Sequence, residues 1–586
     1  MSLKTTLILT GSEIPFIKDR NKKSMLGDWV LETKNVEKIR NFHVLNKPLS
    51  NAQKYRLYKN AKQLKKEVLK ILCVSFNKTF SQKHSELFFD TIFGYWLVHA
   101  ISVFIDRKRL LAPLINNRFS EIIVYKPRLQ LQNVIPETGI EATSNFLNDT
   151  WNQVFLIKLI EKSKLQNVRY RLYKTPNKIS TLKSQKNLLS KWKDICLSFL
   201  FYIFLLNKCF KTKKKIFCDL NIKLFKNILF NNPKILSSFL ILPKLKDRKA
   251  LFSSALRDKI FKTKQNKDIN EVLDYLKNTM PYSYIENFRY FGKCAEKICL
   301  KYKHISTKIL SLHDIIGCDK TKFLTAYLRE KNNTKLIIAQ HGGGAFPAFH
   351  GGFEWQTSIC DKFFCNGAKN VNVKNSVEGG QIWKRLTKHS YNKNGVCLLI
   401  VPNNERYIYD FRSFVIGNQT NNYIKTILKF LSKCNKRIIK NITVRVFRDK
   451  WKIENKLTKA FPLLSIQNDS ISFQKSVRNS RVVFFCYKAT GVNETLSANI
   501  PTILFCGESD WPSDKTSKKD FRILKKVKIY HENYLTASKH LNEIWDNIDD
   551  WWYSKNVQEA RAHFCEKYAN SSPDCFSKLQ SLLYEN

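Results

Sequence analysis

Two short, widely separated segments constrain the fold of this chain more than any other feature. Residues 337–344 (IIAQHGGG) and 482–494 (VVFFCYKATGVNE) each join an apolar run to a loop that contains glycine. Short apolar runs of this kind are typical of parallel strands that are buried on both faces. In open α/β sheets, ligands bind outside the carboxyl ends of such strands, where these loops lie. The sequence therefore predicts two parallel sheets with a ligand between their loop edges.

From about residue 300 onward, apolar runs alternate with amphipathic runs. The predicted strands are residues 308–312, 335–340, 396–401, 442–447, 482–486 and 502–505. Strands that alternate with helices at this spacing form parallel sheets with helices on both faces. We therefore predict an α/β fold with two Rossmann-like domains that face each other across a cleft, and with extra helices in the N-terminal and middle regions.

The length of 586 residues suits two or three domains. We expect an N-terminal Rossmann-like domain with helical insertions at residues 1–370. A C-terminal Rossmann-like domain that binds a nucleotide-type ligand is expected at residues 390–535. Residues 536–586 are predicted to be helices that pack back across the domains.

The chain is strongly basic, with 101 Lys and Arg against 48 Asp and Glu and a formal net charge of +53. Such an excess indicates polyanionic partners: nucleic acid, phosphorylated substrates or an anionic membrane surface. A compositional bias of the source genome is a simpler explanation for part of it, because Lys is abundant together with Asn, Ile and Phe. The basic residues are spread over the chain without a helix-turn-helix, zinc-finger or RNP-like motif, so nucleic-acid binding is the less favoured interpretation.

The 15 Cys residues include no CxxC pair, and Cys360 and Cys365 lack His or Cys partners at zinc spacing. We therefore expect free thiols in a reducing cytoplasm, and no metal site. The N-terminus lacks the pattern of a secretion signal. The apolar residues 195–206 are too few to cross a bilayer, which needs about 20 residues. They predict a core helix or a helix on the membrane surface, followed by a lysine-rich run.

Thr490 and Gly491 are predicted to begin a helix directly after a parallel strand. A helix N-terminus exposes unpaired N–H groups and the positive end of the helix dipole, which suit a phosphate. Gly491 would let the backbone approach that phosphate, and Glu494, one turn further on, could accept the hydroxyls of a ribose. The alternative is a capping box that needs no ligand, with Thr490 and Glu494 as its two partners.

His341 is predicted at the carboxyl end of a strand, before glycines that leave space for a ligand. An imidazole in that position can donate to a phosphate or act as an acid or base. Gln340, Gly342 and Gly343 belong to the same loop and are predicted to contact the ligand. A structural role for His341 is the alternative.

Four further side chains are candidates for chemistry. Glu354 and Asp361 follow the His341 loop and could act as general bases on an acceptor hydroxyl. Arg445 and Arg448 end a predicted strand of the second domain, and the planar fork of an arginine suits a diphosphate. All four could instead be surface charges.

The chain also resembles the transferases encoded in bacterial O-antigen and surface-carbohydrate loci. The resemblance rests on residues 3–6, 27–29, 94–97, 106–107, 340–343, Glu354, Asp361, 490–494, 499–502, 551–552 and 557–558. It implies a GT-B-like glycosyltransferase that moves a sugar from a nucleotide-activated donor to a lipid-linked or glycan acceptor of O-antigen or capsule type. It also implies catalysis without a cofactor or metal, in the cytoplasm or on the inner face of the cytoplasmic membrane.

Under this resemblance, the catalytic candidates are His341, Glu354 and Asp361. The donor would be bound by Gln340, Gly342, Gly343, Arg445, Arg448, Thr490, Gly491 and Glu494. Three alternatives stay open: a nucleotide-sugar epimerase of the same fold, a basic nucleic-acid-binding protein, and a non-catalytic scaffold.

Overall fold

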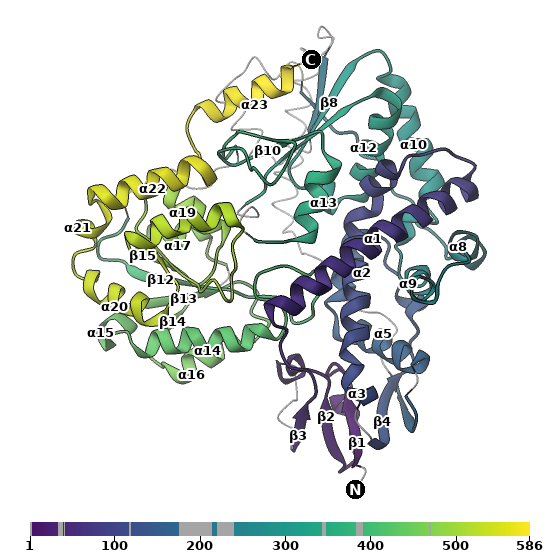
Figure 1. Cartoon of the computed structure of the whole chain (residues 1–586), viewed down its shortest axis with the longest axis horizontal. Helices are drawn as coiled ribbons and strands as arrows, with labels where there is room; N and C mark the ends of the chain where they lie inside the picture. Colours follow the sequence, from purple (N-terminus) through teal and green to yellow (C-terminus); the bar gives the residue numbers. More distant parts are fainter. Residues whose placement is uncertain are drawn as a thin grey trace.

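The residues that the computed structural model describes form three sheets, and every strand pair in them is parallel (Figure 1). The structure describes residues 3–32, 39, 41–116, 119–163, 165–174, 214–218, 239–342, 347–382, 391–467 and 470–585. The predicted apolar segment 195–206 lies outside these residues.

The first sheet is formed by the N-terminal part of the chain. Its strands are β1 (Leu3–Ile8), β2 (Lys22–Met25), β3 (Phe42–Val44), β4 (Phe119–Pro127) and β5 (Val168–Tyr173), in the order β3-β2-β1-β4-β5. The prediction placed one Rossmann-like domain in residues 1–370, but this range contains two sheets. Strands β1 and β4 pair with each other although two long helices, α1 and α2, separate them in the sequence.

The second sheet contains β6 (Lys214–Cys218), β7 (Phe239–Ile241), β8 (Ser306–Ser311), β9 (Lys335–Ala339), β10 (Lys362–Phe364) and β11 (Ser376–Val377). Its order is β11-β10-β9-β8-β6-β7. The third sheet contains β12 (Val396–Val401), β13 (Ile442–Val446), β14 (Ser465–Ile466), β15 (Ser480–Phe485), β16 (Thr502–Phe505) and β17 (Tyr530–His531). Its order, β14-β13-β12-β15-β16-β17, is the 3-2-1-4-5-6 order of Rossmann domains.

The helices of the N-terminal and middle regions form a layer around α1 and α2. They are α1 (Asn51–Phe80), α2 (Glu86–Leu110), α3 (Ala112–Asn116), α4 (Gly139–Phe146), α5 (Asp149–Lys162), α8 (Ser254–Phe261), α9 (Lys267–Lys277), α10 (Phe288–Lys301), α11 (Asp314–Gly317), α12 (Asp319–Asn332) and α13 (Gly351–Ile359). A capping box formed by Ser50 and Gln53 begins α1. Helix α2 lies at the centre of this layer and packs against α1, α12 and α13.

Among the described residues, one helical segment, residues 86–116, is long and apolar enough to cross a membrane. In its most apolar stretch, 83% of the residues are buried inside the protein. Its apolar character is therefore explained by its central place in the helical layer, where neighbouring helices cover it on several sides.

The C-terminal helices surround the third sheet and reach the second. They are α14 (Gln419–Ser432), α15 (Lys436–Ile439), α16 (Ile453–Ala460), α17 (Phe473–Arg478), α18 (Thr490–Ser497), α19 (Lys515–Lys526), α20 (Tyr534–Ile544), α21 (Ile548–Trp552), α22 (Lys555–Tyr568) and α23 (Asp574–Tyr584). Helix α22 packs on α18 and α19. The apolar side chains of α23 join a core cluster with the second sheet, for example Leu579 with Ile337.

The predicted α/β class is confirmed, because the sheets are parallel and the third has the strand order of Rossmann domains. The first sheet is an addition that the sequence did not predict. Residues 390–535 contain the third sheet complete, from β12 to β17.

A fully buried arginine, Arg107, links several of these parts. Its Nη1 donates to Asp106 Oδ2 at 2.8 Å and to the carbonyl of Ile408. Its Nε donates to Asn152 Oδ1 at 2.8 Å, and its Nη2 to the carbonyl of Phe146 at 3.1 Å. The partners lie on α2, α4, α5 and the segment after β12, so one side chain joins the helical layer to the third sheet.

We expect Arg107→Met to lower the free energy of unfolding by about 3–5 kcal/mol, because it leaves the Asp106 carboxylate and two carbonyls buried with fewer donors. Chemical denaturation measures this change. The matched control is Arg437→Met, whose exposed pair with Asp546 should contribute about 0–1 kcal/mol. Equal effects of the two substitutions would contradict the role of the buried network.

Candidate functional site

The two motifs that the sequence singled out meet in the structure. Gly342 follows β9 of the second sheet, and Thr490 begins α18 directly after β15 of the third sheet. Gly342 has a φ of +72°, and a Cβ added to it would lie 2.5 Å from Thr490 Oγ1. The carboxyl edges of the two sheets therefore touch at this point. Gly343 lies outside the described residues.

The side chain of Gln340 holds the loop that carries Gly342. Its Nε2 donates to the carbonyl of Gly342 at 3.0 Å, and its Oε1 accepts from the N–H of Asn366 at 3.0 Å. Asn366 Nδ2 donates to the same carbonyl at 3.1 Å. Gln340 is buried, so its side chain shapes the loop, whereas the prediction had it contact the ligand.

His341 is exposed at the carboxyl end of β9, as the sequence predicted. The edge of its ring faces the ring of His313, with 5.2 Å between the ring centroids. His313 follows β8, the neighbouring strand of the second sheet, and was not predicted as a site residue. Two imidazoles thus lie side by side at this sheet edge, where both can donate to an anion.

The start of α18 differs from the predicted capping box. The N-cap residue is Ala489, whose methyl group cannot accept a capping hydrogen bond, and Thr490 is the first helical residue. A ring of Phe485 and a ring of Phe473 enclose Gly491, where an added Cβ would lie 2.8 Å and 3.1 Å from them. Glu494 is 6% exposed. The capping-box interpretation of Thr490 and Glu494 is therefore wrong.

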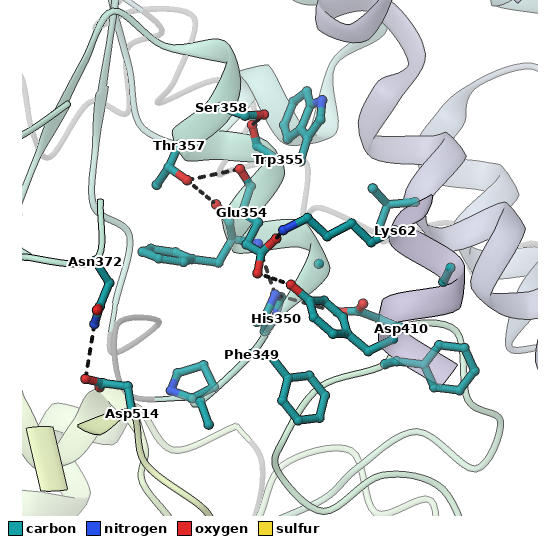
Figure 2. A pocket seen from close by; sticks show the side chains of 18 of the residues that line it. Lys62, Phe349, His350, Glu354, Trp355, Thr357, Ser358, Asn372, Asp410 and Asp514 are labelled. Carbon is teal, nitrogen blue, oxygen red and sulfur yellow. Dashed lines mark hydrogen bonds and ion pairs between the residues drawn. The ribbon is translucent and has the colours of Figure 1, made fainter. Parts of the chain in front are cut away.

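A cleft of about 770 Å³ opens at the same sheet edges (Figure 2). It is bordered by α1, α13 and the loops that follow β9, β10, β12 and β16. The polar side chains that line it are Tyr58, Lys62, Lys65, Ser102, His350, Glu354, Thr357, Ser358, Asn370, Asn372, Asp410, Ser513, Asp514 and Lys515. Four loops at the carboxyl ends of parallel strands therefore surround one cavity, which is where α/β folds bind ligands.

Glu354, a predicted general base, lies on α13 and lines this cleft. Its carboxylate accepts a hydrogen bond from the hydroxyl of Tyr58 and forms an ion pair with Lys62 at 2.7 Å (Figure 2). Burial, and next the charge of Asp410, raise the pKa of Glu354 to about 7. A carboxylate with a pKa near neutrality is suited to remove a proton from a hydroxyl.

His350 and Asp410 are functional candidates that the sequence reasoning missed. His350 is the N-cap residue of α13, and its Nδ1 accepts from the N–H of Phe353 at 3.0 Å. Its neutral ring therefore carries the proton on Nε2. Burial lowers the pKa of His350, although Asp410 Oδ2, 3.6 Å from Nδ1, opposes this shift. The run His350-Gly351-Gly352 repeats the His-Gly-Gly pattern at residue 341 and was the available signal.

Asp361 is not brought into the site. It precedes β10, so it lies at the amino edge of the second sheet, opposite His341. Its Oδ2 accepts from Arg329 Nη2 at 3.1 Å and from the N–H of Leu336 at 2.7 Å. The structure thus gives Asp361 a structural ion pair away from the cleft.

The two predicted arginines lie on the carboxyl side of β13 but do not line the cleft. Arg445 Nη1 donates to Gln467 Oε1 at 2.7 Å and to the carbonyl of Ile471 at 2.9 Å, which secures the segment after β14. Arg448 is exposed beside the ring of Phe447. Within the described part of the chain, no group of three or more His, Cys, Asp or Glu side chains is arranged to hold a metal ion.

We expect Gly342→Ala to destabilise the protein by about 1–3 kcal/mol, because a side chain is strained at a φ of +72° and would collide with Thr490. Gly317→Ala is the matched control, since its added Cβ would have its nearest contact at 3.7 Å. Chemical denaturation compares the two. Combining Gly342→Ala with Thr490→Ala should recover the part of the loss that comes from the collision, and no recovery would mean that the two loops do not touch.

The raised pKa of Glu354 predicts a pH-dependent stability. The folded-state pKa of about 7 lies above the usual value of 4.5, so the folded state binds more protons between these values and loses stability as pH rises through this window. Glu354→Gln should lose less stability over the same window. Lys62→Met removes the nearby cation and should move the window to higher pH. Parallel unfolding curves for wild type and Glu354→Gln from pH 4.5 to 8 would contradict the shift.

The family model "LIC12162 family transferase" matches residues 5–583. The crystal structure of Acinetobacter baumannii MurG has 9% sequence identity and a TM-score of 0.29, and the match covers 63% of this chain and 99% of that one. A trehalose-6-phosphate synthase has 10% identity and a TM-score of 0.30, with 60% and 98% covered. No curated protein matches the chain.

The two structural similarities are too weak to carry an argument. The family match covers nearly the whole chain, including Gly342, Glu354 and Thr490. The chain therefore belongs to the LIC12162 family of transferases.

Proposed function

We propose that the chain is a glycosyltransferase that moves a sugar from a nucleotide-activated donor to a surface-polysaccharide acceptor of O-antigen or capsule type. The observation that carries this proposal is that loops of two sheet edges meet. Gly342 of the second sheet touches Thr490 of the third, and the cleft that Glu354 lines opens between other loops of the same two sheets. A transferase needs room for two substrates, and each sheet edge supplies one set of polar groups.

The donor is assigned to the start of α18 and the loop after β9. The positive end of the α18 dipole and the hydroxyl of Thr490 suit the diphosphate of a nucleotide sugar. His341 and His313 lie across from this helix start, on the edge of the second sheet, and can donate to the leaving phosphate. Glu494 is one turn further along α18, where its carboxylate can accept the hydroxyls of a ribose.

The acceptor is assigned to the cleft. Glu354 would take the proton of an acceptor hydroxyl, and the oxygen would attack the anomeric carbon while the bond to the diphosphate breaks. Tyr58 and Lys62 orient the carboxylate, and the Nε2 proton of His350 offers a further hydrogen bond to the acceptor. The described cysteines are all free thiols, which supports a cytoplasmic enzyme.

The proposal predicts that a nucleoside diphosphate or its sugar conjugate raises the melting temperature of the protein. A ligand at one hundred times its Kd adds about 2.7 kcal/mol to the stability of the folded state. A thermal-shift screen with UDP, GDP, CMP and their sugar conjugates, with and without EDTA, measures this. We expect one nucleotide class to respond, to be insensitive to EDTA, and to lose its effect in Glu494→Gln.

The same screen includes its controls. The free nucleosides lack phosphate and should leave the melting temperature unchanged, and Arg437→Met should respond as the wild type does. No response to any nucleotide would contradict the proposal. Conversion of a nucleotide sugar to its epimer without an acceptor would favour the epimerase alternative.

A further inference from the structure

Helix α1 presents a basic face to solvent. Every third or fourth residue of a helix lies on one side, and the exposed residues at these positions are Tyr55, Lys59, Lys62, Lys66, Lys70 and Val74. At 1.5 Å per residue this face is about 28 Å long. Lysine occupies its four central positions, and two apolar side chains mark its ends: Tyr55 is 44% exposed and Val74 is 69% exposed. We call these six residues the α1 face.

The charge of the α1 face is mostly not neutralised by the protein. Lys62 pairs with Glu354, while Lys59, Lys66 and Lys70 form no ion pair within the described part of the chain. The only acidic residue of α1, Glu67, accepts a hydrogen bond from Gln63 instead. The ammonium group of Lys59 lies 4.8 Å from the centre of the Tyr55 ring. Three positive charges therefore remain for an external partner.

The α1 face borders the mouth of the cleft. Tyr58, Ala61, Lys62 and Lys65 of the same helix line the cavity, and Lys515 at the start of α19 lines it from the third-sheet side. Figure 2 shows Lys62 extending from α1 to Glu354. Whatever binds to the α1 face is thus held beside the entrance of the candidate acceptor site.

We propose that the α1 face docks the protein on an anionic lipid bilayer, with the mouth of the cleft next to the membrane surface. A straight helix with a row of lysines suits a plane of anionic headgroups, which attract each basic residue by Coulomb forces. The aromatic Tyr55 and the aliphatic Val74 can enter the interfacial region, as apolar side chains of surface-lying helices do.

The geometry favours a membrane over nucleic acid. Proteins that bind single-stranded nucleic acid combine a positively charged groove with several aromatic side chains on which bases stack. The α1 face is convex, has one aromatic residue at one end, and contains lysines, whose point charges lack the planar fork that arginine offers to phosphates and bases. This docking does not depend on the proposed transfer reaction.

The test is co-sedimentation of the full chain with phosphatidylcholine vesicles that contain or lack phosphatidylglycerol. We expect binding to the anionic vesicles, weakened by salt, and none to pure phosphatidylcholine. The triple variant Lys59→Gln/Lys66→Gln/Lys70→Gln should bind the anionic vesicles at least about tenfold more weakly. The matched control is Lys425→Gln/Lys433→Gln/Lys440→Gln, which removes three exposed lysines on α14 and at the ends of α14 and α15. This control should bind like the wild type.

Three outcomes would overturn the docking proposal. The first is that the wild type fails to bind anionic vesicles, and the second is that the control variant loses as much binding as the α1 variant. The third is that an oligonucleotide binds more tightly than the vesicles and that only the α1 variant loses this binding. The melting temperature of each variant shows that it is folded. The nucleotide response of the α1 variant should equal that of the wild type, so failure of docking and failure of the proposed function are told apart.

Discussion

The guanidinium of Arg107 has no access to water, so each of its donors needs a partner inside the protein. Those partners fix α2 against α5 and against the segment that follows β12 of the third sheet. Helix α2 in turn holds α13, because Trp355 Nε1 donates to the carbonyl of Asp90 at 2.9 Å. Helix α13 carries Glu354, and the segment after β12 carries Asp410. The positions of both cleft carboxylates therefore depend on the hydrogen bonds of the Arg107 guanidinium.

The parts of the fold that the sequence predicted share one property: their signal is local. The apolar runs at β9, β12, β15 and β16 are short and uninterrupted, which is the pattern of strands that are buried on both faces. Strand β13 instead alternates buried with half-buried residues. That Gly342 and Thr490 each lie just after a strand was also predictable, since each follows an apolar run, whereas their contact joins two different sheets. The first sheet was hidden because β1 and β4 are more than a hundred residues apart, with two long helices between them.

The rest of the site depends on tertiary contacts that no local pattern reports. Tyr58, Glu354 and Asp410 come from three elements that are far apart in sequence, and burial together with the charge of Asp410 raises the pKa of Glu354. Asp361 shows the opposite error. It is close to His341 in sequence, but Asp361 precedes strand β10 whereas His341 follows strand β9. The two residues therefore lie at opposite edges of the second sheet.

The contact between Gly342 and Thr490 has a consequence for motion. One residue belongs to the second sheet and the other to the third, so any hinge rotation that opens or closes the cleft must change the space between them. The absence of a side chain at residue 342 sets how far the two units can close. Under the proposed function, a diphosphate bound at Thr490 would hold Gly342 away from it, so the angle between the two sheets would report whether the donor is bound.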